Sequence, residues 1–244
     1  MTVFNLPSQG VLYTSENHPL ADGKIELRPM KAKDEQVLVA NTPDVLDKLL
    51  NRCIVSEGVQ AKDLYHQDKM FLLYMLRAIS YGEDYSFVVK CPDCNEKNHH
   101  TINILNKDHM AVNSLEKLGP FTVEMSGAVI TWDFITGEQE STIQRRLKNL
   151  KKVRREDEGA YIYNYAATIR TIDGDEPSPK TAIDFIKELS VKDLALLEDS
   201  MYEYRFGIVN DFILECESCF SESEVAIPLT ETFFRPNRRV GRRQ

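Results

Sequence analysis

One structural unit occurs twice in this sequence, and any fold of the chain has to accommodate both copies. A shift of 125 residues carries Cys91 onto Cys216 and Cys94 onto Cys219, without a gap in the register. The same shift places Tyr81-Gly82 on Phe206-Gly207, Phe87-Val88-Val89 on Phe212-Ile213-Leu214, Ile102 on Ile227 and Ile104 on Leu229. Each copy predicts a helix, a glycine stop, an apolar strand, a C-x-x-C turn and a returning strand. We interpret the two copies as an internal duplication.

The chemistry of cysteine explains why one such unit needs the other. A single C-x-x-C turn presents two thiolates, whereas a structural zinc ion takes four ligands in a tetrahedron. We therefore predict that Cys91, Cys94, Cys216 and Cys219 form one structural zinc site. Such an ion closes a loop of over a hundred residues and stabilises the fold. Four thiolate ligands leave no open position for metal-assisted catalysis.

Three other interpretations of the cysteines stay open at this point. Local ligation by Cys91, Cys94 and one of His99 and His100 is the strongest of them; only one histidine could reach inward, because adjacent strand residues face opposite ways. Ordinary buried cysteines would have no reason to share spacing and register. A thioredoxin-like redox pair would begin a helix, whereas both pairs here precede a predicted strand. The fifth cysteine, Cys53, is expected to be a small core residue.

Composition restricts the class of protein. The chain has 244 residues, 42% hydrophobic and 28% charged, which is enough to bury one large core or two small ones. It has no apolar run of about 18 to 20 residues that could cross a membrane, and its first residues lack the features of a secretion signal. We therefore expect a soluble cytosolic protein, in which C-x-x-C pairs favour metals over disulfides. The net charge of −8 argues against general binding of nucleic acid.

The periodicity of apolar residues predicts an α+β fold: a mostly helical body with short antiparallel hairpins and a split, zinc-ribbon-like pair of C-x-x-C turns. The expected helices span residues 31–40, 43–50, 63–81, 138–158, 160–172, 181–189 and 191–205, and the expected strands 11–14, 24–27, 85–90, 98–104, 121–124 and 129–135. From Met70 to Tyr81 the third helix is apolar on nearly every side. We expect it to be the central helix of the core.

We expect residues 1–244 to form a single compact domain. Within it, residues 1–105 are the N-terminal half with the first C-x-x-C turn, 106–180 an insertion with a hairpin and a charged helix, 181–234 the C-terminal half with the second turn, and 235–244 a basic tail. A solvated face is the simplest interpretation of the charged helix, with docking of an acidic partner or of nucleic acid as alternatives. The tail contains five arginines and cannot build a core.

Motifs that would indicate catalysis are missing from the sequence. It contains no Ser/His/Asp or Cys/His arrangement, no phosphate-binding glycine loop and no H-E-x-x-H. The acidic run Asp173–Glu176 resembles a calcium loop only briefly, because Ser178 and Asp184 stand where such a loop has glycine and glutamate. We expect a turn there, no enzymatic activity and no small-molecule substrate.

Four segments are distinctive in combination: F-N-L-P-S-Q-G at the start, I-E-L-R-P-M-K-A-K-D-E, the helix M-F-L-L-Y-M-L-R-A-I-S-Y-G and the strand-borne C-P-D-C. With them the chain resembles the baseplate hub and hub-assembly proteins of T4-like contractile-tailed bacteriophages, most strongly from Phe4 to Ile104. The resemblance implies a structural or assembly role at the tail baseplate, with other baseplate, hub or tail proteins as partners. It also implies synthesis in the host cytoplasm, and leaves open whether the protein stays in the virion. A zinc-ribbon phage regulator that binds nucleic acid is the alternative.

Overall fold

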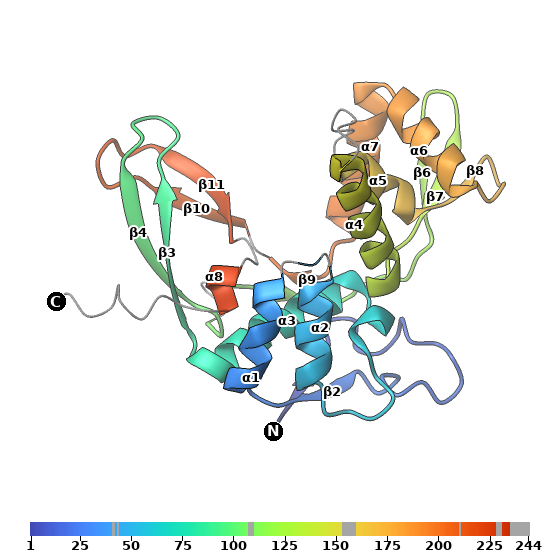
Figure 1. Ribbon diagram of the computed structural model, residues 1–244. Coiled ribbons are helices and arrows are strands. Elements are labelled where there is room, and N and C mark those ends of the chain that lie inside the picture. Colours follow the sequence, from blue (N-terminus) through green and yellow to red (C-terminus); the bar gives the residue numbers. More distant parts are fainter. Residues whose placement is uncertain are drawn as a thin grey trace.

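The structure is a computed structural model that describes residues 1–40, 42, 44–106, 110–152, 160–209, 211–227 and 231–234. Helices and small antiparallel sheets make up the body, and two hairpins project from it side by side (Figure 1). Buried apolar side chains of the described residues gather in two clusters, one around the N-terminal helices and one against a three-stranded sheet.

The first cluster surrounds α3 (His66–Tyr81), the helix predicted to be central. Its residues Leu72–Leu76 are buried in succession, so the helix is covered on every side, as its apolar sequence requires. The other elements of this cluster are α1 (Ala32–Glu35), α2 (Val45–Cys53), the 3₁₀ helices Gln36–Ala40 and Ala61–Asp63, and the antiparallel pair β1 (Thr2–Asn5) and β2 (Lys24–Leu27). Cys53 is fully buried here, which confirms it as a core residue.

The second cluster packs helices against an antiparallel sheet. The sheet has the order β6 (Phe121–Glu124), β7 (Val129–Trp132) and β8 (Ile169–Ile172), and the helices are α4 (Gly137–Lys152), α5 (Ala160–Thr168), α6 (Pro179–Glu188) and α7 (Val191–Glu203). Trp132 is buried among aromatic rings, and its indole N–H donates to Ser200 Oγ at 2.9 Å. Ser190 is the N-cap of α7, and its side chain accepts a hydrogen bond from the N–H of Asp193.

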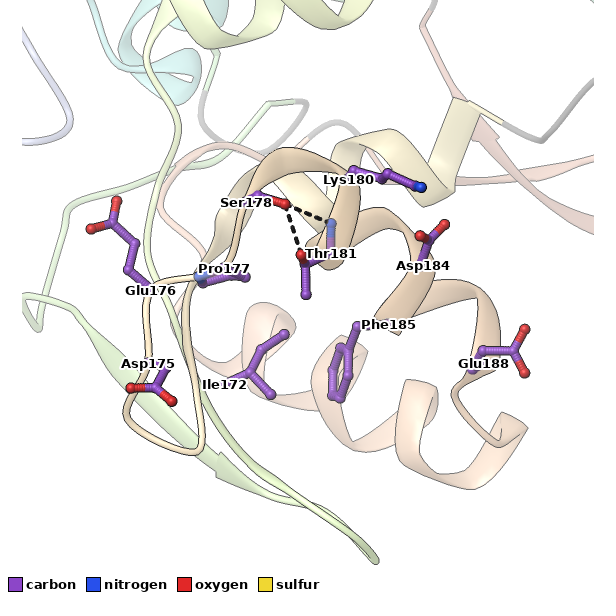
Figure 2. A pocket seen from close by; sticks show the side chains of 10 residues that line it. All are labelled: Ile172, Asp175, Glu176, Pro177, Ser178, Lys180, Thr181, Asp184, Phe185 and Glu188. Atoms are coloured by element: carbon purple, nitrogen blue, oxygen red, sulfur yellow. Dashed lines mark hydrogen bonds between the residues drawn. The ribbon is translucent and has the colours of Figure 1, made fainter.

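A shallow hollow lies at the start of α6 (Figure 2). Ser178 caps this helix: its Oγ accepts from the N–H of Thr181 at 3.1 Å, and the two hydroxyl oxygens lie 2.7 Å apart. The predicted turn in the acidic run is confirmed, with Asp173 and Gly174 both at positive φ. The carboxylates around the hollow spread apart in Figure 2, and within the described residues they are not part of any group that could hold a metal ion.

The projecting hairpins are rooted in the first cluster. The first hairpin consists of β3 (Asp84–Lys90) and β4 (Lys97–Asn103), and the second of β10 (Asp211–Glu215) and β11 (Glu222–Ala226). Each is a separate two-stranded sheet. Just before the second hairpin in the chain, β9 (Gly207–Ile208) pairs with β5 (Val112–Asn113). After the second hairpin comes the short helix α8 (Glu231–Phe234). Phe233 and Phe234 of α8 are fully buried in the first cluster, so this helix anchors the end of the second hairpin.

Most predicted elements are confirmed, and two are wrong. Residues 11–14, predicted as a strand, form a turn and loop, and β2 pairs with β1 instead. This loop follows Gln9 and Gly10, which both have positive φ. Tyr13 is buried in the loop without pairing to a strand, and its hydroxyl donates a hydrogen bond to Asp68. Residues 160–172 are not one helix, because α5 ends at Thr168 and the β-branched segment of β8 pairs with β7.

The fold class is confirmed as mixed α/β with short antiparallel sheets. Residues 153–158 of the predicted charged helix, the repeat position Leu229 and the basic tail 235–244 lie outside the described residues. The division into a single domain with the boundaries given above stays a prediction.

None of the described helices is both long enough and apolar enough to span a bilayer.

Candidate metal centre

The first knuckle (residues 91–94) and the second knuckle (residues 216–219) share one backbone conformation. In the first, the N–H of Cys91 donates to the carbonyl of Glu96 at 2.8 Å, and the N–H of Asn95 donates to the carbonyl of Cys91 at 3.0 Å. The second knuckle repeats both bonds at the equivalent positions, at 2.9 Å each. Two backbone hydrogen bonds therefore close each turn, and both of its cysteines belong to the same tight loop.

A turn of this kind places the residue after the second cysteine in the left-handed region. Asn95 has a φ of 64° there, and Phe220 has a φ of 59°. Asparagine adopts this conformation readily, whereas it is strained for a bulky aromatic residue. Phe220 is also 72% exposed, so burial of its ring does not offset that strain.

The strands that flank the knuckles are also in equivalent register. Lys90 lies opposite Lys97 in the first hairpin, and Glu215 lies opposite Glu222 in the second. The glycines that precede the two units agree as well, since Gly82 and Gly207 have φ values of 92° and 91°. The sequence repeat therefore extends to the backbone of both hairpins. Its origin by duplication stays an interpretation.

The two knuckles bring four sulfur atoms into one cluster. The Sγ atoms of Cys91, Cys94, Cys216 and Cys219 all lie within 4.8 Å of one another. Two contacts cross between the knuckles: Cys91 Sγ to Cys219 Sγ at 3.6 Å and Cys94 Sγ to Cys216 Sγ at 3.6 Å. Disulfide sulfurs would be about 2 Å apart, and all four cysteines are free. Four thiolates at about 2.3 Å from a zinc ion are separated by about 3.8 Å, so the cluster fits a tetrahedral metal site.

Burial differs between the two cysteines of each knuckle. Cys91 and Cys216 are buried, whereas Cys94 and Cys219 are exposed. The first sulfur of each pair therefore faces the protein and the second faces solvent. This arrangement gives a metal ion a route to the cluster from one side.

Asn98 of β4 connects the first hairpin to the second knuckle. Its side chain is buried, and its Nδ2 donates to Cys216 Sγ at 3.4 Å while its Oδ1 accepts from the N–H of Glu217 at 2.9 Å. Sequence analysis did not identify this residue. One feature of the sequence could have identified it: Asn98 is polar, yet it lies four residues before Ile102 and so on the same, buried face of the strand.

Ser221 makes the reciprocal contact from the second hairpin. Its Oγ lies 3.3 Å from Cys91 Sγ and 3.1 Å from Cys219 Sγ, so one hydroxyl touches a sulfur of each knuckle. This residue was also missed, because a serine two positions after a C-x-x-C pair has no distinctive pattern. With Asn98 it forms a polar shell that orients the cysteines.

Hydrogen bonds set the thiol pKa values in the cluster. The backbone N–H of Cys94 lowers the pKa of Cys91 to about 6, and that of Cys219 lowers the pKa of Cys216. Cys94 behaves differently: the backbone N–H of Glu96 lowers its pKa, but hydrogen bonds to Cys219 and other cysteines of the cluster raise it to about 12. Metal binding would release the protons that these thiols still carry.

The geometry bears on the alternative ligand sets. His99 is exposed and the ring of His100 lies 5.9 Å from that of Phe87; neither is part of the group of four that could hold a metal. A strand, not a helix, follows each knuckle, which does not favour a thioredoxin-like redox pair. Among the described residues, the cysteines alone form such a group.

Residues 10–235 match the family model described as T4 bacteriophage base plate protein. The matched span covers both knuckles, the whole second hydrophobic cluster and every buried residue of the first except Leu6. No curated protein and no solved structure matches.

Proposed function

Because this chain belongs to the T4 bacteriophage base plate protein family, we propose that it acts in the hub of the tail baseplate. The family supports a structural role in the virion tail and contacts with other phage structural proteins. The finer proposal is that the protein holds or assembles neighbouring hub subunits and has no enzymatic activity. It is made in the host cytoplasm, where it joins the growing baseplate.

We also propose that Cys91, Cys94, Cys216 and Cys219 hold a structural zinc ion. The observation that carries this proposal is the group of four sulfurs within 4.8 Å, contributed by knuckles far apart in the sequence. Four thiolates suit zinc, which prefers tetrahedral sulfur ligation in structural sites. Such an ion contributes on the order of ten kcal/mol to the folding of small zinc domains.

The function of the ion in this proposal is to make the hairpins rigid. A two-stranded hairpin on its own is only marginally stable in water, and each hairpin here is a separate two-stranded sheet. Zinc joins their tips while α8 and the first cluster hold their bases. The hairpins then present fixed surfaces to neighbouring subunits.

The alternative function, a zinc-ribbon regulator that binds nucleic acid, is not favoured. The family is one of baseplate proteins, and the net charge of the chain is −8. A salt-dependent shift of DNA in a gel, at physiological ionic strength, would restore this alternative.

Complementation of a phage that lacks this protein tests the proposal. The wild-type chain and Ser218→Ala, a change inside the second knuckle that keeps all four sulfurs, should restore complete baseplates. Replacing Cys91 and Cys216 together by serine should leave incomplete baseplates, visible in electron micrographs. Mass spectrometry of purified tails then separates a stoichiometric hub subunit from a transient assembly factor. Normal baseplates without the protein would contradict the hub role, and full rescue by the double serine variant would contradict the role of zinc.

A further inference from the structure

Each hairpin has an outer face that points away from its buried side. The two outer faces are equivalent in the sequence repeat, but they carry different residues. The basic face of the first hairpin consists of Val88, Lys90, Lys97 and His99, all exposed. The acidic face of the second hairpin consists of Ile213, Glu215, Glu222 and Glu224, all exposed. The 125-residue shift carries each member of the first set onto a member of the second, in the order given. The two faces therefore have similar backbone shape.

Charge is reversed between the two faces. Lys90 and Lys97 are directly opposite one another across the first hairpin, and Glu215 and Glu222 are directly opposite across the second. Like charges in such cross-strand positions destabilise a hairpin. None of the four forms an ion pair with another described residue. Both hairpins thus keep an unfavourable pair of charges that a second molecule of opposite charge would neutralise.

An apolar side chain occupies the same position on each face, next to the pair of like charges. Val88 is 50% exposed and Ile213 is 73% exposed. A hollow of about 460 Å³ lies beside Ile213, and its lining includes Tyr202 of α7 and Arg205, two residues beyond the end of that helix. The hollow adjoins the acidic face, and both faces belong to hairpins that project from the body (Figure 1). The two faces are opposite in charge, and each carries one exposed apolar side chain beside its charged pair.

We propose that the basic face of one copy of this chain binds the acidic face of the next copy, so that copies associate head to tail. Lys90 and Lys97 then pair with Glu215 and Glu222 of the neighbour, around a contact between Val88 and Ile213. A contact between two different faces of one chain is heterologous and generates a ring or an open filament rather than a two-fold dimer. The surface is small and mostly charged, so the association is weak and depends strongly on salt. This inference does not require the knuckles to bind zinc.

Charge reversal tests the proposal on the purified full-length chain by sedimentation velocity at low ionic strength. The wild-type chain should form oligomers that dissociate as salt is added. K90E/K97E and E215K/E222K should each raise the dissociation constant at least about a hundredfold, because like charges then meet. An equal mixture of the two variants, and the chain with all four reversals, should associate again, since opposite charges face one another in both. K24E/K180E and E16K/E188K, which change the net charge equally at exposed sites elsewhere, are the matched controls.

Each result decides the proposal. A monomeric wild-type chain, loss of association in the controls as well, or failure of the fourfold reversal to restore it overturns the proposal. If a reversal variant does not fold by circular dichroism, zero-length carbodiimide crosslinking of the wild-type chain decides instead. In a mixture of unlabelled and ¹⁵N-labelled chains, crosslinks between Lys90 or Lys97 and Glu215 or Glu222 should join chains of different mass. Only same-chain crosslinks would contradict the head-to-tail contact.

Discussion

Asn98 of the first hairpin donates a hydrogen bond to the sulfur of Cys216 in the second, across 3.4 Å. The same side chain accepts from the backbone of Glu217 and is buried. The hairpins are thus joined directly by protein atoms at the point where their sulfurs meet. Hydrogen bonds to metal ligands hold them in position and tune their affinity for the ion.

Replacing Asn98 by alanine should weaken zinc binding by about 10- to 100-fold, because Cys216 loses its donor and the N–H of Glu217 loses its acceptor. Competition with a chromophoric chelator measures the affinity. Thr101→Ala on the same strand removes only an exposed hydrogen bond to Ser86 and serves as the control. Equal affinities for the two variants would show that Asn98 does not position the site.

The residue after each knuckle allows a reciprocal test of backbone strain. Phe220→Asn should raise the free energy of unfolding by about 0.5 to 1 kcal/mol, because asparagine tolerates positive φ and the exposed ring contributes little burial. Asn95→Phe at the equivalent position should lower it by a similar amount. Thermal unfolding of the zinc-loaded proteins measures both. Changes of the same sign in the two variants would contradict the explanation by backbone conformation.

The cysteine cluster was predictable because its signal is local: the spacing within each knuckle and the repeated register of the flanking strands. Asn98 and Ser221 were not, since each contacts a sulfur of the opposite hairpin and only the tertiary fold shows that contact. Long apolar helices such as α3 were also predictable. The strand β8 was missed because it follows α5 without a break, and its pairing with β7 is a tertiary interaction.

A partly buried ionic network around the buried Lys69 joins helices of the two hydrophobic clusters. Lys69 of α3 contacts Asp47 of α2 at 2.8 Å and Glu140 of α4 at 2.6 Å, and Glu140 also lies 2.9 Å from Nδ1 of His66. Burial alone would raise the pKa of Glu140, but His66 and Lys69 lower it to about 2. A carboxylate whose pKa falls on folding stabilises the folded state above its unfolded pKa.

We therefore expect Glu140→Gln to lower the free energy of unfolding at pH 7 by about 2 kcal/mol. The difference from the wild-type chain should shrink as the pH falls from about 4.5, the unfolded pKa, toward about 2, where the wild-type carboxylate is protonated too. Urea unfolding at several pH values measures this, and the cysteine cluster is common to both chains. Glu138→Gln, an exposed site on α4, is the control. A difference that does not depend on pH would contradict the ionic role of Glu140.

Arg77 anchors the C-terminal helix to α3. Its buried guanidinium donates to the carbonyls of Phe233, Gly82 and Asp84 at 3.0, 2.7 and 3.1 Å. Lysine cannot reproduce this planar set of donors, so Arg77→Lys should destabilise the protein by about 2 kcal/mol and expose the α8 segment to protease. Urea unfolding and limited proteolysis measure these effects. Arg145→Lys, at an exposed site, should change neither, and the same behaviour in both variants would contradict the anchoring role.

Native mass spectrometry of the full-length chain, purified in the presence of zinc, tests most directly whether the four cysteines share one ion. We predict one zinc ion per folded chain, retained in Ser218→Ala and lost when Cys216 and Cys219 are both replaced by serine. A folded wild-type chain without metal, or a double serine variant that keeps its zinc, would show that the four cysteines do not share one ion.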